Sequence, residues 1–191
     1  MSNTPLTDSY WLVPGRLLAG EYPGAITDEE TRCKLQSILD AGISFFLDLT
    51  EEDEGLEPYE PLLLEEAVAR ERTVIYQRLA IPDLDTPTTE RMSEIQRVIA
   101  GALDTGHTIY VHCCGGIGRT GMVSGCYLVE QEVSGAEALA EIRRRRRGTA
   151  NGWMNSPETR AQENFVKSWR SLVAQRQPQR KAKDYAVAAQ V

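Results

Sequence analysis

The chain has 191 residues and a formal net charge of −7, a size that predicts one domain with a substantial buried core. An acidic balance argues against general nucleic-acid binding, which needs a basic face. The first residues have neither the basic start nor the apolar run of a signal peptide, and no segment approaches the ~18 apolar residues of a membrane span. We therefore expect a soluble domain with neither nucleic acid nor membrane as its partner.

The cysteine and histidine content indicates neither disulfide staples nor a metal site. The cysteines show no paired C-x-x-C pattern, and His107 and His112 are the only histidines. A chain of this length does not need disulfides, so we expect a reducing, cytoplasmic setting in which a free thiol survives. The cysteines are Cys33, Cys113, Cys114 and Cys126. For Cys33 and Cys126 we expect the ordinary role of a small buried apolar residue.

In the first half of the chain, strand-like and helix-like segments alternate. Pro14-Gly15 is a turn pair that predicts a small hairpin, and Gly42 is a helix stop. The expected elements are strands over 11–13 and 16–19, a helix over 28–41, a strand over 44–49, a helix over 58–72 and a strand over 73–79.

In the second half, one short strand is followed only by helices. A loop rich in Pro and Asp over 81–87 leads into an amphipathic helix over 88–103 and a strand over 108–111. The expected helices after it cover 120–131, 134–147 and 156–172, with Ser134 and Ser156 as their N-caps. Residues 1–173 would form the domain, and residues 174–191, rich in Gln, Arg and Lys, would form a disordered tail.

Strands that alternate with helices predict an α/β fold, with a mainly parallel central sheet flanked by helices. In such sheets the site lies beyond the carboxyl ends of the strands. The loop that follows Val111 is at such an end.

This loop, His112-Cys113-Cys114-Gly115-Gly116-Ile117-Gly118-Arg119-Thr120-Gly121, has the properties of a phosphate cradle. Between a strand and a helix, several backbone N–H groups and the positive helix end point at one small volume. Its glycines let the backbone curl, and Arg119 offers a planar fork for two phosphate oxygens. Cys113 opens the cradle, where the same N–H groups favour ionisation of its thiol. A nucleophile and a clamp therefore stand at the two ends of an oxyanion-binding loop made of residues 114–119.

The run HCCGGIGRTG resembles the signature H-C-x-x-G-x-x-R-[ST]-G of the protein tyrosine phosphatase superfamily, and is closest to its compact dual-specificity branch. Its Gly-Gly-x-Gly-Arg core is similar to that of the cyclin-dependent kinase-associated phosphatase and its bacterial relatives. The resemblance implies the phosphotyrosine protein phosphatase fold and a cysteinyl-phosphate intermediate without metal or cofactor. It also implies that His112 supports the loop and the thiolate. Thr120 can donate its hydroxyl to that thiolate.

The resemblance also implies an aspartate about thirty residues before the cysteine, which protonates the leaving oxygen. Asp83, in IPDLDTP, has that spacing, and we favour it over its rival Asp85. The same carboxyl would then act as the base toward water. Farther on, the run SPETRAQENFV resembles a late segment of the family whose glutamine helps to place the hydrolytic water. Gln162 is its counterpart, and a surface glutamine beside a core phenylalanine is the equally weighted alternative.

The predicted activity is metal-independent hydrolysis of phosphomonoesters on phosphorylated proteins by a monomer, with phosphotyrosine as the first substrate class. A phosphoinositide or small-molecule phosphatase is one alternative, although the loop lacks the lysines that lipid phosphatases often carry there. A module that binds phosphoproteins without turnover is another. A dinucleotide site on G-x-G-x-x-G, residues 116–121, is disfavoured because a helix rather than a strand is expected next.

Two further features have two interpretations each. Arg143–Arg147 are five consecutive arginines, which we expect on a solvated helix face ahead of a role in guiding an acidic partner. Cys114 either fills space or traps an oxidised Cys113 as a strained vicinal disulfide, and we favour the first.

Overall fold

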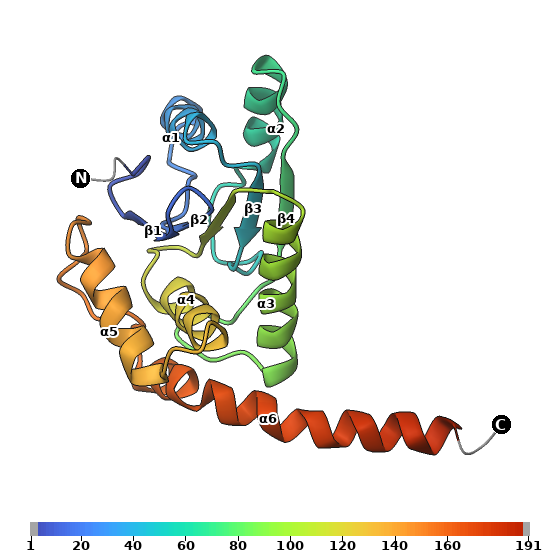
Figure 1. The fold of residues 1–191 in the computed structure, drawn as a ribbon. Helices are drawn as coiled ribbons and strands as arrows, with labels where there is room; N and C mark the ends of the chain where they lie inside the picture. Colours follow the sequence, from blue (N-terminus) through green and yellow to red (C-terminus); the bar gives the residue numbers. More distant parts are fainter. Residues whose placement is uncertain (1–3, 189–191) are drawn as a thin grey trace.

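The computed structural model describes residues 4–188, and their strands form one sheet in the order β1-β2-β5-β3-β4. β1 pairs with β2 in antiparallel orientation, whereas β2, β5, β3 and β4 run parallel to one another. This arrangement confirms the predicted mainly parallel sheet, and it places β5 at the centre (Figure 1). The strands are β1 (Ser9–Val13), β2 (Leu17–Gly20), β3 (Phe45–Asp48), β4 (Ile75–Arg78) and β5 (Ile109–His112).

Helices cover both faces of the sheet and enclose two hydrophobic cores. α1 and α2 pack on one face, while α3, α4, α5 and α6 lie on the other (Figure 1). Every residue of β2, β3 and β5 is buried, which explains why these strands read as continuous apolar runs. The helices are α1 (Asp28–Asp40), α2 (Glu60–Ala69), α3 (Thr89–Asp104), α4 (Gly118–Glu130), α5 (Gly135–Arg146) and α6 (Arg160–Ala188).

Side-chain caps explain where α1, α3 and α5 begin. Thr27 accepts a hydrogen bond from the Glu30 amide, and Thr88 caps α3 in the same way. Ser134 and Glu137 form a reciprocal capping box, which confirms the predicted cap of α5.

The start of α6 differs from the prediction. Ser156 does not cap this helix, because its hydroxyl donates instead to the Ile117 carbonyl of the phosphate loop at 2.7 Å. The cap is Thr159, whose hydroxyl accepts from the Gln162 amide at 3.2 Å. Because Ser156 is recruited by a distant part of the chain, the local cap pattern was misleading.

The far end of α6 overlaps the segment over 174–191, and the expected disordered tail stays a prediction. The backbone of the helix continues to Ala188, and residues 189–191 lie outside the described part of the chain. Gln, Arg, Lys and Ala are good helix formers, so the composition that predicts a polar tail also permits a helix.

The arginine run and Cys33 need corrections as well. Arg146 is buried and donates to the carbonyls of Met154, at 2.9 Å, and Asn151, at 3.1 Å, so it anchors the loop after α5. Arg143, Arg144 and Arg147 are exposed, as expected. Cys33 is exposed on α1 rather than buried, whereas Cys126 is fully buried.

Candidate active site

The phosphate loop joins the central strand β5 to the N-terminus of α4, and the β1–β2 hairpin supports its shape. Gly116 has a φ of 67°, a conformation that favours glycine. A Cβ at this position would lie 2.5 Å from the carbonyl carbon of Gly20 at the end of β2. The next residues of that hairpin hold the loop too, because the Tyr22 amide donates to the Cys114 carbonyl at 2.8 Å. Glycine is therefore required here both by backbone conformation and by space.

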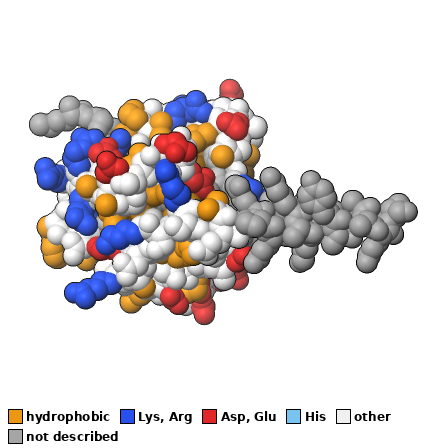
Figure 2. Space-filling model, turned by 60° about the horizontal axis from the view of Figure 1, so that its bottom comes forward, with side chains coloured by type: hydrophobic (Ala, Val, Ile, Leu, Met, Phe, Trp, Pro, Cys, Tyr) orange, Lys and Arg blue, Asp and Glu red, His pale blue; other side chains and the backbone are white. Residues whose placement is uncertain are grey.

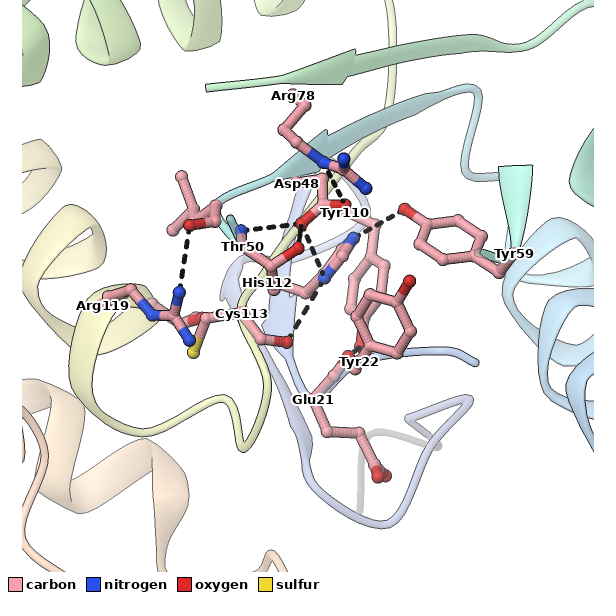
Figure 3. A network of polar contacts seen from close by, with 12 residues as sticks. Glu21, Tyr22, Asp48, Thr50, Tyr59, Arg78, Tyr110, His112, Cys113 and Arg119 are labelled. Carbon is pink, nitrogen blue, oxygen red and sulfur yellow. Dashed lines mark hydrogen bonds and ion pairs between the residues drawn. The ribbon is translucent and has the colours of Figure 1, made fainter. Parts of the chain in front are cut away.

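Cys113 and Arg119, the two ends of the loop, lie together in a buried position. Their exposed fractions are 3% and 1%. The Cys113 sulfur points to the side of the loop that the Arg119 guanidinium occupies (Figure 3). This is the placement that a nucleophile and an oxyanion clamp require.

Glu54 holds the guanidinium of Arg119 in place. Its two carboxylate oxygens accept from Nη1 and from Nη2, the latter at 2.8 Å. Burial by itself would raise the pKa of Glu54, but the hydrogen bonds from Arg119 and from the Glu51 amide outweigh it and lower that pKa. Burial would likewise lower the pKa of Arg119, but the Glu54 hydrogen bonds reverse the effect and raise it. Arg119 therefore stays cationic and keeps a fixed orientation.

One donor of Arg119 has no protein partner. Nη1 also donates to the backbone carbonyl of Ile81, at 3.2 Å. Among the residues that the structure describes, Nε of Arg119 is one of two buried side-chain polar atoms without a hydrogen-bond partner, the other being Oε1 of Gln96. Buried donors are almost always satisfied, so an unpaired guanidinium N–H beside the cradle fits a site for an oxyanion.

The structure distinguishes Asp83 from Asp85. Oδ1 of Asp83 lies 3.0 Å from Nη2 of Arg119, and this side chain is 58% exposed. Oδ1 of Asp85 accepts instead from the Thr86 amide at 2.7 Å, within its own loop. Asp83 is thus the aspartate of the pair that reaches the clamp.

His112 forms a hydrogen-bonded link between the sheet and the start of the phosphate loop. Burial lowers the pKa of this histidine, so its ring is neutral at neutral pH. Burial also raises the pKa of Tyr59 well above its ordinary value. The Tyr59 hydroxyl is therefore the donor in its 2.6 Å hydrogen bond to Nε2, which leaves the ring proton on Nδ1, 3.4 Å from the Cys113 carbonyl. The imidazole positions the backbone of the nucleophile.

A buried carboxylate, Asp48 at the end of β3, lies beside this histidine (Figure 3). One oxygen accepts from the amide and the hydroxyl of Thr50, and the other from the Tyr76 hydroxyl at 2.7 Å and from Arg78 at 3.3 Å. Burial would raise the pKa of Asp48, but the hydrogen bonds from Thr50 and Tyr76 contribute to lowering it. The charge is compensated by its partners, and it braces β3 and β4 against β5.

Gln162 and Thr120 have contacts other than those expected. Gln162 is fully buried, so the alternative of a surface glutamine is wrong. Its Oε1 accepts from the amides of Glu158 and Thr159, and its Nε2 donates to the Asp85 carbonyl at 3.1 Å. It therefore connects the start of α6 to the Asp83 loop. The Thr120 hydroxyl points to the Gly20 carbonyl, at 3.5 Å, rather than to the thiol.

Cys114 extends outward from the loop while the nucleophile is buried. Cys114 is exposed as a residue, but partial desolvation of its thiol and the neighbouring Cys113 raise its pKa. It therefore remains protonated at neutral pH. No group of three or more His, Cys, Asp or Glu side chains between residues 4 and 188 is arranged to hold a metal ion. In the same range, no helix is long and apolar enough to cross a bilayer.

Sequence reasoning missed Glu54, Tyr59 and Asp48. All three lie more than fifty residues before the loop that they support. The signal for Glu54 was a run of acidic residues, 51–54, in a chain with one arginine at the cradle. No local pattern pointed to Tyr59 or Asp48, because their roles depend on the neighbouring strands β3 and β5.

Comparisons with known proteins agree with this geometry. A segment of 73 residues is 38% identical to the Arabidopsis thaliana protein described as phosphatidylinositol 3,4,5-trisphosphate 3-phosphatase and protein-tyrosine-phosphatase PTEN1; it covers 38% of this chain and 17% of that protein. The crystal structure of Tk-PTP in its active form superposes with a TM-score of 0.64 at 26% identity, covering 88% of this chain and 97% of that one. Kinase associated phosphatase (KAP), with serine for its catalytic-site cysteine, gives a TM-score of 0.68 at 21% identity, covering 87% and 94%.

A family model covers most of the chain. It is described as "Swiss Army Knife protein, DSP-PTPase phosphatase domain", and it matches residues 7–180. The match includes the hairpin, the cradle, the Asp83 loop and the first part of α6. The chain therefore belongs to the dual-specificity branch of the protein tyrosine phosphatase superfamily, as a member of this phosphatase domain family.

Proposed function

We propose that this chain hydrolyses phosphomonoesters on proteins, with phosphotyrosine as the first substrate class and phosphoserine or phosphothreonine as further ones. The observation that carries the proposal is the buried pair of Cys113 and Arg119 at the two ends of one loop, with an unpaired Nε–H beside it. Membership of a phosphatase domain family supports the reaction class.

The geometry supports a reaction in two steps. Sγ of Cys113 attacks phosphorus, an S–P bond forms, and the P–O bond to the leaving group breaks. Arg119 and the loop N–H groups hold the oxygens of the transferred phosphoryl group, while Asp83 in its protonated form gives a proton to the leaving oxygen. Water then attacks the phosphocysteine, Asp83 accepts its proton, and the S–P bond breaks to release phosphate and the thiolate.

Arg119 forms ion pairs with both Glu54 and Asp83. When a phosphate enters, its oxygens compete with Asp83 for Nη2. The carboxylate released from this ion pair is then free to carry the proton that the leaving oxygen needs. Glu54, which is only 14% exposed at its side chain, stays as the support of the clamp.

Turnover of p-nitrophenyl phosphate in EDTA, by wild type and by Cys113→Ser, tests the proposal. We expect metal-independent turnover by the wild type and none by the variant, because serine at this position is a far weaker nucleophile than a thiolate. Phosphopeptide binding without turnover by the wild type would instead identify a binding module. The Arabidopsis relative is named as a phosphoinositide phosphatase as well, so phosphate release from phosphoinositide-containing lipid vesicles is measured in parallel.

A further inference from the structure

The segments that contact the phosphate loop carry charge of a single sign. Residues 21–26 reach the loop through the Tyr22 amide, and residues 156–159 through the Ser156 hydroxyl. Residues 50–57 and 81–85 reach it through Arg119. All the charged residues of these four segments are acidic: Glu21, Glu51, Glu52, Asp53, Glu54, Glu57, Asp83, Asp85 and Glu158. We call this set the acidic rim.

Contacts place several of these carboxylates next to the cradle. Glu54 and Asp83 bind Arg119 directly. Glu51 accepts from the Asp83 amide at 3.3 Å, which brings the two loops together. On the other side, Oε2 of Glu158 lies 3.2 Å from where a Cβ on Gly118 would be, so this exposed side chain lies over the loop itself.

Cations neutralise the rim only in part. Lys34 pairs with Glu21 at 3.3 Å, and Arg78 pairs with Glu52 at 3.7 Å while it also serves Asp48. Asp53, Asp85 and Glu158 are exposed to solvent. Within the loop from Cys113 to Arg119, the clamp is the single basic residue. One phosphate can therefore be neutralised in the cradle, whereas a second anionic group beside it would face carboxylates.

We propose, on the basis of the proposed function, that the acidic rim selects a singly phosphorylated residue flanked by lysine or arginine. Basic flanks complement the rim, and acidic flanks or neighbouring phosphates are repelled by it. The rim thus acts in specificity, outside the chemistry that Cys113, Arg119 and Asp83 perform.

The test compares kcat/KM for three phosphotyrosine peptides of one core sequence, flanked by Lys, Gln or Glu, together with inositol hexakisphosphate. We expect the order Lys, Gln, Glu at low ionic strength, with roughly a tenfold span that shrinks in 0.5 M NaCl because salt screens exposed charges. Hydrolysis of the hexakisphosphate should be slower than that of any peptide.

Two double variants with the same change in net charge distinguish an effect of the acidic rim from an effect of the overall charge of the protein. Asp53→Asn with Glu158→Gln should narrow the ratio of Lys-flanked to Glu-flanked kcat/KM at least threefold. Asp40→Asn with Asp104→Asn makes the same charge change at the ends of α1 and α3, which precede strands and so lie at the opposite edge of the sheet. This control should keep the wild-type ratio.

Equal kcat/KM values for the three peptides, or faster hydrolysis of inositol hexakisphosphate, would overturn the rim proposal. The proposed phosphatase activity would still stand as long as the wild type hydrolyses p-nitrophenyl phosphate. If the wild type does not hydrolyse p-nitrophenyl phosphate at all, the proposed function itself is refuted. An equal change of the ratio in both double variants would also overturn the rim proposal, because it would show an effect of net charge alone.

Discussion

At the scale of single residues, the charged side chains of the site pair with one another. Arg119 is oriented by Glu54 from one side and contacted by Asp83 from the other. His112 is neutral and accepts a hydrogen bond from the Tyr59 hydroxyl. Hydrogen bonds to charged partners are worth about 1.5–3 kcal/mol each, enough to keep these side chains in single orientations. The cradle is therefore preorganised rather than assembled on binding.

Asp83→Asn and Asp85→Asn should differ sharply. Asp83 reaches the clamp and Asp85 does not, so loss of the proton donor should lower kcat on a phosphotyrosine peptide by about 10²–10⁴-fold in the first variant and little in the second. The loss in Asp83→Asn should be smaller on p-nitrophenyl phosphate, whose leaving group needs less protonation. Measured kcat across pH should show a flattened basic limb for this variant. Equal, small effects in both would mean that neither aspartate is the acid.

At the scale of elements, the phosphate loop depends on parts of the chain far from it. The hairpin β1–β2 packs against Gly116, and the segment before α6 bonds to Ile117 through Ser156. Gln162 on α6 then connects to the Asp83 loop. The order of strands, with β5 between β2 and β3, is what brings these pieces to one edge.

Gly116→Ala should cost more stability than a positive φ alone explains. Gly106, in the turn before β5, is the matched control: it has a φ of 89° but open space around its missing Cβ. Alanine at Gly106 should cost about 1 kcal/mol through backbone strain, whereas at Gly116 the added clash with Gly20 should raise the cost and reduce turnover. Urea unfolding and p-nitrophenyl phosphate assays on both variants measure this difference. Equal losses of stability in the two variants would show that the β1–β2 hairpin moves to accommodate the alanine methyl group at position 116.

Much of this architecture was predictable, because the informative residues are contiguous. Cys113 to Arg119 form one loop after one strand, and the alternation of apolar runs with amphipathic segments predicted the sheet and its helices. What failed depends on distant contacts. The Ser156 hydroxyl is used by Ile117, and Arg146 of the arginine run is buried under the loop that it anchors. Neither outcome follows from neighbours in the sequence.

At the scale of the whole molecule, the face drawn in Figure 2 carries side chains of both signs, with more of the Lys and Arg side chains on its left half and more of the Asp and Glu side chains towards its right and lower edges. The formal net charge of −7 is consistent with this pattern.

Folding stability should fall as the pH drops below about 6.5, the ordinary pKa of histidine. The folded-state pKa of His112 is lowered by burial, so the unfolded chain takes up a proton that the folded chain does not. The resulting loss of stability grows as the pH falls from 6.5 until the folded-state pKa of His112 is reached. Asp48 and Glu54, whose pKa values are also lowered, add their own losses below about pH 4.5.

Thermal unfolding midpoints of wild type and His112→Gln between pH 7.5 and 5 check this expectation. The wild-type midpoint should fall over this range, and the variant, although less stable at pH 7.5, should show a flatter profile. A wild-type midpoint that stays constant to pH 5 would mean that the ring is protonated inside the fold.

The contact between Gly20 and Gly116 gives the N-terminal ribbon a part in reactivity, although none of its side chains takes part in the chemistry. Its last residue, Gly20, packs directly against the backbone of the phosphate loop. Exchanging residues 8–22 for those of a homologue should therefore alter phosphate affinity even if the transplanted piece folds well. A residue larger than glycine at position 116 would push the hairpin and the phosphate loop apart or distort the loop.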